Sequence, residues 1–338
     1  MQMTPTVVVG VGDAGLDIVD RLHDSDGLGW GSAYNERFEY VTIDSDGAKV
    51  WSVPDGVTKV HLQPRGSVET DIQTYPYLTE SLYISDKGAQ RQRPVGRYKL
   101  DSSGSYEATV EAITETVETH VETIKGSSDL GPELNVVHVH SLGGGTGSGT
   151  FPLVASIIDD LVAAVESEHG IEVFTAGIGI TTETFLNLDT YRPPGDERYY
   201  ANTYAALRDL KKLIDADPDD PLPIHRYTEF EDVEDLMAFN IDGVEPQREL
   251  TGLPYQNYFF ISVDEAQMAI DEGGPEPYRD AVDNGLVAAV YGIAAEWGST
   301  RLHMRARLGR WDIHPGHSAH SIRPSSRFPS SACERTAT

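Results

Sequence analysis

Apolar residues follow two alternating patterns along the chain: short apolar runs, and longer segments in which they recur every three or four positions. The short runs predict strands at residues 6–11, 40–43, 135–141, 171–180 and 258–263. The helical spacing predicts helices at residues 13–24, 105–124, 150–167, 197–214 and 277–297. Residues 49–100 have poor periodicity and predict loop with short helices. Strands that alternate with helices predict an α/β fold, a doubly wound and mostly parallel sheet with helices on both faces.

A glycine-rich turn follows the first predicted strand and opens the first predicted helix. It has the form G-x-G-x-x-G, and its residues are Gly10, Gly12, Asp13, Ala14 and Gly15. Glycines let backbone amides approach a phosphate closely, and the helix N-terminus adds partial positive charge. The motif by itself also fits an NAD-dependent oxidoreductase, in which Asp44 at the end of the second strand would hold a ribose.

A second and longer glycine segment lies between another strand and helix, about 130 residues later. It contains Gly143, Gly144, Gly145, Thr146, Gly147, Ser148 and Gly149. Its glycines permit unusual backbone angles, so that consecutive N–H groups can converge on one anion, and its hydroxyls are further donors. The segment lacks the lysine of a P-loop. Two amide-donating loops suit a mononucleotide with a polyphosphate tail, whereas a dinucleotide fold needs only one.

Charge and composition narrow the class of protein. The 338 residues have a formal net charge of -28 and are 39% hydrophobic, which indicates a globular chain. Such an acidic surface repels nucleic acid and anionic membranes, and we expect neither as a partner. Few lysines among many carboxylates suggest a halophilic host. No basic leader or long apolar run appears, so we expect a cytoplasmic protein without membrane insertion.

The last residues differ from the rest of the chain. Residues 301–338 contain seven arginines against two carboxylates, and the single cysteine, Cys333, lies among them. One cysteine excludes an internal disulfide. The apolar residues of this tail have neither period, which predicts a disordered arm that contacts something acidic or a frame-shifted continuation.

The second glycine segment resembles the GGGTG(S/T)G signature of the tubulin and FtsZ superfamily, which lies between a strand and a helix. The resemblance extends over about residues 5–297, and it is closest to divergent prokaryotic members, with a haloarchaeal origin expected. It implies a GTP-binding domain at residues 1–275, a central helix at 276–298 and an atypical tail at 299–338. It also implies GTP or GDP as the ligand, with Mg²⁺, and self-association as a cytoskeletal element or nucleotide-dependent scaffold.

The resemblance also implies roles for particular residues. Both glycine segments would bind phosphate, and Gly88, Arg93 and Arg97 fall in the loop that senses the terminal phosphate. Glu197 and Asn202 fall near the ribose, while Asp264 and Asp283 fall where the family contacts guanine. A carboxylate at Asp283 can accept from both N1–H and the exocyclic amine of guanine, which adenine does not offer. The structural alternative for Asp283 is a solvated helix residue.

Other polar residues allow more than one interpretation. Asp44 and Asp46 could hold Mg²⁺ through water or cap a helix. Arg91, Arg93 and Arg97 could bind phosphate or solvate a loop. His138 and His140 alternate on a strand, but no third ligand has the spacing of a metal site.

The sequence leaves the chemistry after nucleotide binding open. Tubulin-type hydrolysis uses carboxylates that follow the central helix, and residues 298–310 contain none. The catalytic residues therefore stay unknown, and the chain is at most a GTPase. The alternatives are the NAD-dependent oxidoreductase and a structural tubulin-like protein whose nucleotide site has decayed.

Overall fold

The structure of the chain is a computed structural model. The residues that it describes are 4–23, 37–64, 75, 77–79, 82, 84, 87–181, 196–224, 248–261, 285, 287, 290 and 292. By its contacts the chain divides into two units, Met1–Leu302 and His303–Thr338, and every described residue belongs to the first. The predicted tail and most of the predicted helix at residues 277–297 lie outside the described residues.

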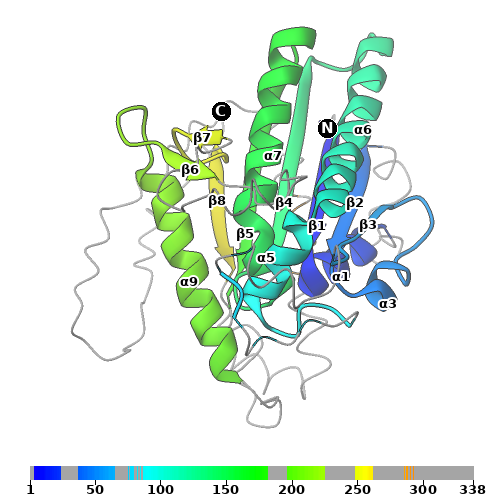
Figure 1. The fold of residues 1–338 in the computed structure, drawn as a ribbon. Helices are drawn as coiled ribbons and strands as arrows, with labels where there is room; N and C mark the ends of the chain where they lie inside the picture. Colours follow the sequence, from blue (N-terminus) through cyan, green and yellow to red (C-terminus); the bar gives the residue numbers. More distant parts are fainter. Residues whose placement is uncertain are drawn as a thin grey trace, which may run out of the picture. The chain divides into compact units, whose positions relative to one another are not determined.

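A six-stranded sheet forms the middle of the described fold, and every neighbouring pair in it is parallel (Figure 1). In spatial order its strands are β3 (Thr58–His61), β2 (Phe38–Asp44), β1 (Thr6–Val11), β4 (Glu133–Ser141), β5 (Glu172–Ile180) and β8 (Asn257–Ile261). A separate antiparallel pair joins β6 (Leu222–Ile224) to β7 (Arg248–Leu250). The predicted α/β class with a parallel sheet is confirmed.

Helices cover both faces of the sheet. One face carries α5 (Arg93–Asp101), α6 (Ser103–Gly126), α7 (Thr146–His169) and α9 (Asp196–Asp215). The other carries α1 (Gly12–His23) and α3 (Gly47–Val50), together with the helical residues Val287 and Val290. Successive residues of β1 serve the two faces in turn, because Val9 packs in the first core and Val8 in the second. Figure 1 shows α7 between α6 and α9.

The structure corrects two predictions made from the apolar pattern, the start of one helix and the absence of a strand from residues 49–100. Helix α7 begins at Thr146, four residues before the predicted start. The prediction began too late because the first turn of the helix contains the glycines of the second segment, and glycine has low helix propensity. Strand β3 lies in the stretch predicted as loop, and its four residues are too few to show alternation.

Among the described residues, one helix has the length and composition to cross a membrane. This helix is α7, and 67% of its most apolar window is buried inside the fold. Phe151 and Leu153 belong to the core beside the sheet, as in a core helix.

Candidate functional site

The turns that follow β1 and β4 meet at the carboxyl end of the sheet. These two strands are neighbours, and the strand order changes direction between them, which is where open α/β sheets bind ligands. A Cβ atom on Gly12 would lie 2.9 Å from the backbone nitrogen of Gly147, and Gly12 has a φ of +75°. Only glycine suits that position, and the two predicted phosphate loops are therefore in direct contact.

The first turn is closed by its outer glycines. A Cβ atom on Gly10 would lie 2.4 Å from the carbonyl oxygen of Gly15, and one on Gly15 would lie 2.7 Å from the carbonyl oxygen of Val139. Between them, Asp13 is exposed and pairs with Lys49 at 2.7 Å, and Ala14 is half-buried. The absence of side chains at the two glycines thus sets α1 directly against β1 and β4.

The second turn presents the N-terminus of a long helix. The Ser141 hydroxyl accepts hydrogen bonds from the amides of Gly143 and Gly144, each at 3.2 Å. Helix α7 then begins at Thr146, and Gly145 at its N-cap makes no side-chain capping bond. The first amides of a 24-residue helix, with their partial positive charge, lie beside Gly12 and suit an anionic ligand.

The segment at residues 88–97 is built onto the second turn. A Cβ atom on Gly145 would lie 2.9 Å from the backbone nitrogen of Gln92 and 3.0 Å from that of Arg91. Gln90 and Arg91 have positive φ values of 47° and 61°. Such a conformation costs a residue other than glycine roughly 1 kcal/mol or more, and strain of this kind gathers at functional sites.

Arg93 fastens α5 to α7 and α9. Its Nε donates to the carbonyl oxygen of Ser148 at 2.8 Å, and its guanidinium forms an ion pair with Asp209 of α9. Pro152 has no N–H to bond the Ser148 carbonyl within α7, so that carbonyl is open to Arg93. The described contacts of Arg93 link three helices, and its predicted place near a terminal phosphate stays a prediction.

Asn202 fastens α9 to the same loops. Its amide nitrogen lies 3.0 Å from the carbonyl oxygen of Arg91, 2.9 Å from that of Gly143 and 3.3 Å from that of Gly144. A peptide carbonyl and the N–H of the same peptide point in opposite directions. By holding the carbonyls of Gly143 and Gly144, Asn202 orients the amides of the next two residues away from α9. Glu197, predicted with Asn202 near a ribose, is exposed in the first turn of α9.

Asp44 is a buried carboxylate between the loops. Its Oδ1 accepts from the amide of Asp46 at 2.8 Å and from the Thr146 hydroxyl at 3.3 Å. Burial raises the pKa of Asp44 to about 6, with the negative charge of Asp13 as a smaller cause. Asp46 accepts from the amide of Ala48 at 3.0 Å and caps α3, as the structural alternative has it. The magnesium role of both residues stays a prediction.

Lys99 is a member of this region that sequence reasoning missed. It is completely buried, and its Nζ lies 3.2 Å from the carbonyl oxygen of Ser45 and 3.4 Å from that of Gly88. Gly88, with a φ of +76°, packs against Asp46. Lys99 therefore joins the turn after β2 to the predicted terminal-phosphate loop. No pattern in the sequence distinguishes it from an ordinary surface lysine of a helix.

The two histidines of β4 are buried beside aromatic side chains. His138 Nδ1 lies 2.5 Å from the Tyr255 hydroxyl, and His140 Nε2 lies 2.9 Å from the Tyr258 hydroxyl. Burial lowers the pKa of His138 well below its ordinary value and that of His140 to about 3, so both rings are neutral. Within the described ranges no group of three His, Cys, Asp or Glu residues could hold a metal ion.

Asp264, Asp283 and Arg97 are the remaining predicted site residues. Asp264 and Asp283, the predicted guanine contacts, lie outside the described residues. Arg97 lies with its Nε 3.6 Å from Asp101 within α5.

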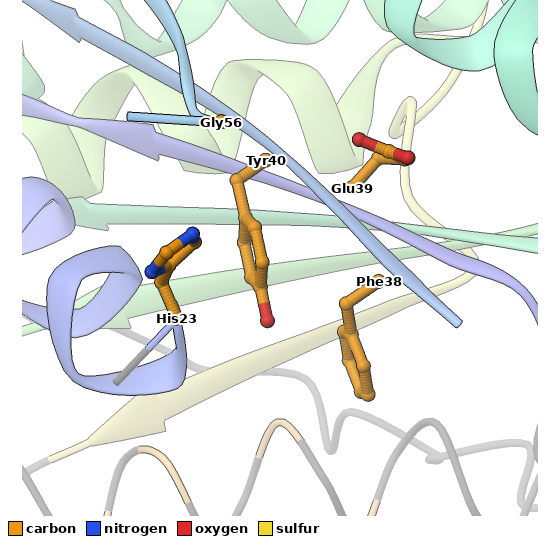
Figure 2. Close-up of a pocket in the computed structure, with 5 residues that line it drawn as sticks. All are labelled: His23, Phe38, Glu39, Tyr40 and Gly56. Atoms are coloured by element: carbon orange, nitrogen blue, oxygen red, sulfur yellow. The ribbon is translucent and has the colours of Figure 1, made fainter. Parts of the chain in front are cut away.

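A cavity of about 150 Å³ lies at the other end of the sheet. Figure 2 shows its lining residues, His23, Phe38, Glu39, Tyr40 and Gly56. Phe38 begins β2, so this cavity is at the amino ends of the strands, away from both glycine turns. Because open α/β sheets bind ligands at the carboxyl ends of their strands, the glycine turns, and not this cavity, are the candidate ligand site.

Replacing Asn202 with alanine is expected to lower the free energy of unfolding by about 1 to 3 kcal/mol, because the carbonyl oxygens that accept from its amide would stay buried without a hydrogen-bond donor. Lys212→Ala, an exposed change on the same helix, is the matched control and should stay within about 0.5 kcal/mol of the parent chain. Denaturant titration followed by circular dichroism measures both. Equal stability of the two variants would contradict the role given to Asn202.

Comparison with known proteins identifies the family of this chain. A family model described as tubulin like matches residues 72–315, which is more than half of the chain. No curated protein matches.

Solved structures with similar folds include three prokaryotic proteins. CetZ2 from Haloferax volcanii, in a GTPgS-bound protofilament, is 16% identical with a TM-score of 0.40 and coverage of 86% of this chain and 58% of its own. FtsZ of M. jannaschii is 16% identical, with a TM-score of 0.42 and coverage of 89% and 57%. TubZ of Bacillus thuringiensis serovar israelensis is 14% identical, with a TM-score of 0.46 and coverage of 86% and 56%. This chain thus spans less than two thirds of the length of these relatives.

The family match includes the second glycine turn and the strained segment that is built onto it. The chain therefore belongs to the tubulin-like family.

Proposed function

We propose that this protein binds a guanine nucleotide, GTP or GDP, with its phosphates across the two glycine turns. The observation that carries the proposal is the contact between Gly12 and Gly147 at the uncapped N-terminus of α7. A side chain at Gly12 would fill the space between the turns, and the helix end beside it favours negative charge. The phosphate ligands in this proposal are backbone amides, and the Thr146 and Ser148 hydroxyls lie in the same turn.

Mg²⁺ fits the same site, because Asp44 places a buried carboxylate beside Thr146 at its edge. When bound, Mg²⁺ would neutralise phosphate charge. Asp44 and Asp46 would hold it through water, while Asp46 also keeps α3 capped. For the base, the proposal keeps Asp283 and Asp264 as the guanine contacts and Glu197 near the ribose.

Family membership supports the second part of the proposal, which is that copies of the chain associate with one another as a cytoskeletal element or a scaffold. The structural neighbours from Haloferax volcanii and Bacillus thuringiensis serovar israelensis are themselves described as protofilaments. Hydrolysis is not part of the proposal.

The nucleotide released from purified protein tests the first part. Denaturing the protein and separating the released compounds by chromatography should yield GDP or GTP. Replacing Asp283 with alanine should weaken GTP binding about tenfold or more, since a hydrogen bond to a charged group contributes about 1.5 to 3 kcal/mol.

Each other result points to a different protein. Release of NAD would favour the oxidoreductase, and neither bound nucleotide nor GTP affinity would favour a decayed site. Unchanged GTP binding in the Asp283→Ala variant would remove the base assignment.

A further inference from the structure

Helix α9 has two apolar faces, and only one of them is buried. Ala206, Leu210 and Leu213 pack into the core beside α7. On the neighbouring side, four large apolar residues are exposed, and together they form what we name the α9 stripe. Its members are Tyr200 (47% exposed), Tyr204 (64%), Leu207 (40%) and Ile214 (41%). Contiguous exposed apolar surface marks sites of contact with other molecules, whereas apolar residues scattered singly on a surface are ordinary.

The stripe has the spacing of a helix that pairs with another helix. Its residues are separated by four, three and seven positions, and Lys211 occupies the remaining place in the four-three repeat. Figure 1 shows α7 on one side of α9 and no labelled helix on the other. The outer residues are symmetric about Leu207, because Tyr200 and Ile214 are each seven residues from it, whereas Tyr204 and Lys211 are three and four residues away.

Charge indicates that the occupant is a second copy of the same chain. The full sequence has a net charge of -28, whereas α9 contains four acidic and four basic residues and is neutral. Two copies of so acidic a protein repel over most of their surface, and a neutral helix is where they can approach. A basic partner would instead be attracted to the acidic remainder of the surface.

We propose that the α9 stripe is an antiparallel contact between two copies of this chain, related by a two-fold axis at Leu207. In this pairing Leu207 meets its counterpart, Tyr200 meets Ile214 of the second copy, and Tyr204 faces Lys211 of the second copy in a cation–π contact. The two Arg208 side chains also approach each other across the axis. Each guanidinium carbon lies 5.9 Å from the centre of its own Tyr204 ring, and salt screens the repulsion between the two.

This contact would be linked to the nucleotide site through α9 itself. Asn202 and Asp209 lie on the same helix and hold the second glycine turn and Arg93. The inference therefore rests on the self-association part of the proposed function, and it adds the surface, the orientation of the copies and a route to the loops.

Sedimentation velocity of the full chain over a concentration series in concentrated potassium chloride tests the contact. The parent chain should form dimers, and the double variant Tyr204→Glu, Leu207→Glu should raise the dissociation constant at least about thirtyfold, as loss of central interface residues does. The matched control Lys212→Glu introduces the same residue at an exposed position of α9 outside the stripe. Thermal unfolding of all three chains checks that the monomer is intact.

Cross-linking tests the orientation. In a Cys333→Ser background, Leu207→Cys should form an intermolecular disulfide on oxidation, and Lys212→Cys should not. Tyr200→Cys should link to Ile214→Cys in a mixture of the two, and not to itself. Linking of Tyr200→Cys to itself would overturn the antiparallel arrangement.

Other outcomes separate this inference from the proposed function. A parent chain that is monomeric at every concentration, with the stripe variant less stable, would show that the chain covers its own stripe and would overturn the inference. GTP-dependent assembly that the stripe variant leaves unchanged would overturn the inference alone. Dimers that form and respond to the variants in a chain without GTP affinity would support the contact and refute the nucleotide site.

Discussion

Replacing Asp44 with asparagine is expected to raise the free energy of unfolding by up to about 3 kcal/mol at pH 8, and by progressively less as the pH falls toward 4. Burial raises the pKa of Asp44 from an ordinary 3.8 to about 6 in the folded chain. As the pH rises, the unfolded chain ionises first, so the native state loses stability between about pH 4 and pH 6 and does not regain it above. The difference of roughly two pKa units corresponds to about 3 kcal/mol, which is the upper limit of the gain, because the buried amide group of asparagine needs hydrogen-bond acceptors of its own.

Denaturant titrations of metal-free, nucleotide-free protein at intervals between pH 4 and pH 8 measure this effect. The matched control is Asp55→Asn in the exposed turn before β3, which should change stability by less than about 0.5 kcal/mol at each pH. A stability difference for Asp44→Asn that does not vary with pH would contradict the burial of a charged carboxyl at this place.

The Asp44 prediction also bears on function. A buried carboxylate that lowers stability despite the hydrogen bonds it accepts is a typical feature of ligand sites. If Asp44 serves Mg²⁺ and the nucleotide, the stabilised Asp44→Asn protein should bind the Mg²⁺ complex of GTP more weakly than the parent chain. If the Asp44→Asn variant is more stable but binds the Mg²⁺ complex of GTP as tightly as the parent chain, Asp44 has a structural role only.

Replacing Gly149 with alanine should lower the free energy of unfolding by about 2 kcal/mol. A Cβ atom there would lie 2.3 Å from the carbonyl oxygen of Arg93 and 3.0 Å from the amide nitrogen of Arg97, both backbone atoms of α5. Overpacking of this kind costs about 1 to 3 kcal/mol or more, and the gain in helix propensity from alanine is at most about 1 kcal/mol. The cost of the steric conflict therefore exceeds the gain in helix propensity, and α5 must move away from α7.

Gly104→Ala is the control for Gly149→Ala, since Gly104 lies in α6 with no atom within 4 Å of an added Cβ. That variant should be unchanged or more stable, by up to about 1 kcal/mol. Both changes are compared by thermal and denaturant unfolding, and GTP affinity is measured in the same samples. A Gly149→Ala protein as stable as the Gly104→Ala protein would show that α5 does not pack on the glycine turn as described.

Much of the fold could be predicted from the sequence, because parallel strands that are buried on both faces consist of continuous runs of apolar residues. Strand β1 was predicted at its observed bounds, and α6 was predicted within two residues at each end, because its apolar residues recur without interruption. The start of α7 was predicted too late for a reason that lies in the tertiary structure. Helix propensity argues against its glycines, but the contacts with β1 and α5 require them.

The candidate site also has a part that could be predicted from the sequence and a part that could not. The two glycine turns are visible in the sequence, since each combines a strand, a run of small residues and a helix, and parallel connection brings both to one edge of the sheet. The partners of these turns are not visible. Lys99 reads as a surface residue and is buried. Asn202 holds backbone carbonyls of the glycine turn, and its predicted place near a ribose stays a prediction.

The sequence by itself determined five of the six strands of the parallel sheet, the family and the glycine loops that are proposed to hold phosphate, because these depend on local periodicity and on glycine at fixed spacing. Only the tertiary structure decided which polar side chains fasten those loops, since each fastening joins residues far apart in the chain. Arg93 and Asp209 are 116 positions apart, and Asn202 and Gly143 are 59. Such pairs follow from how α5, α7 and α9 pack on the sheet, and no local pattern contains that information.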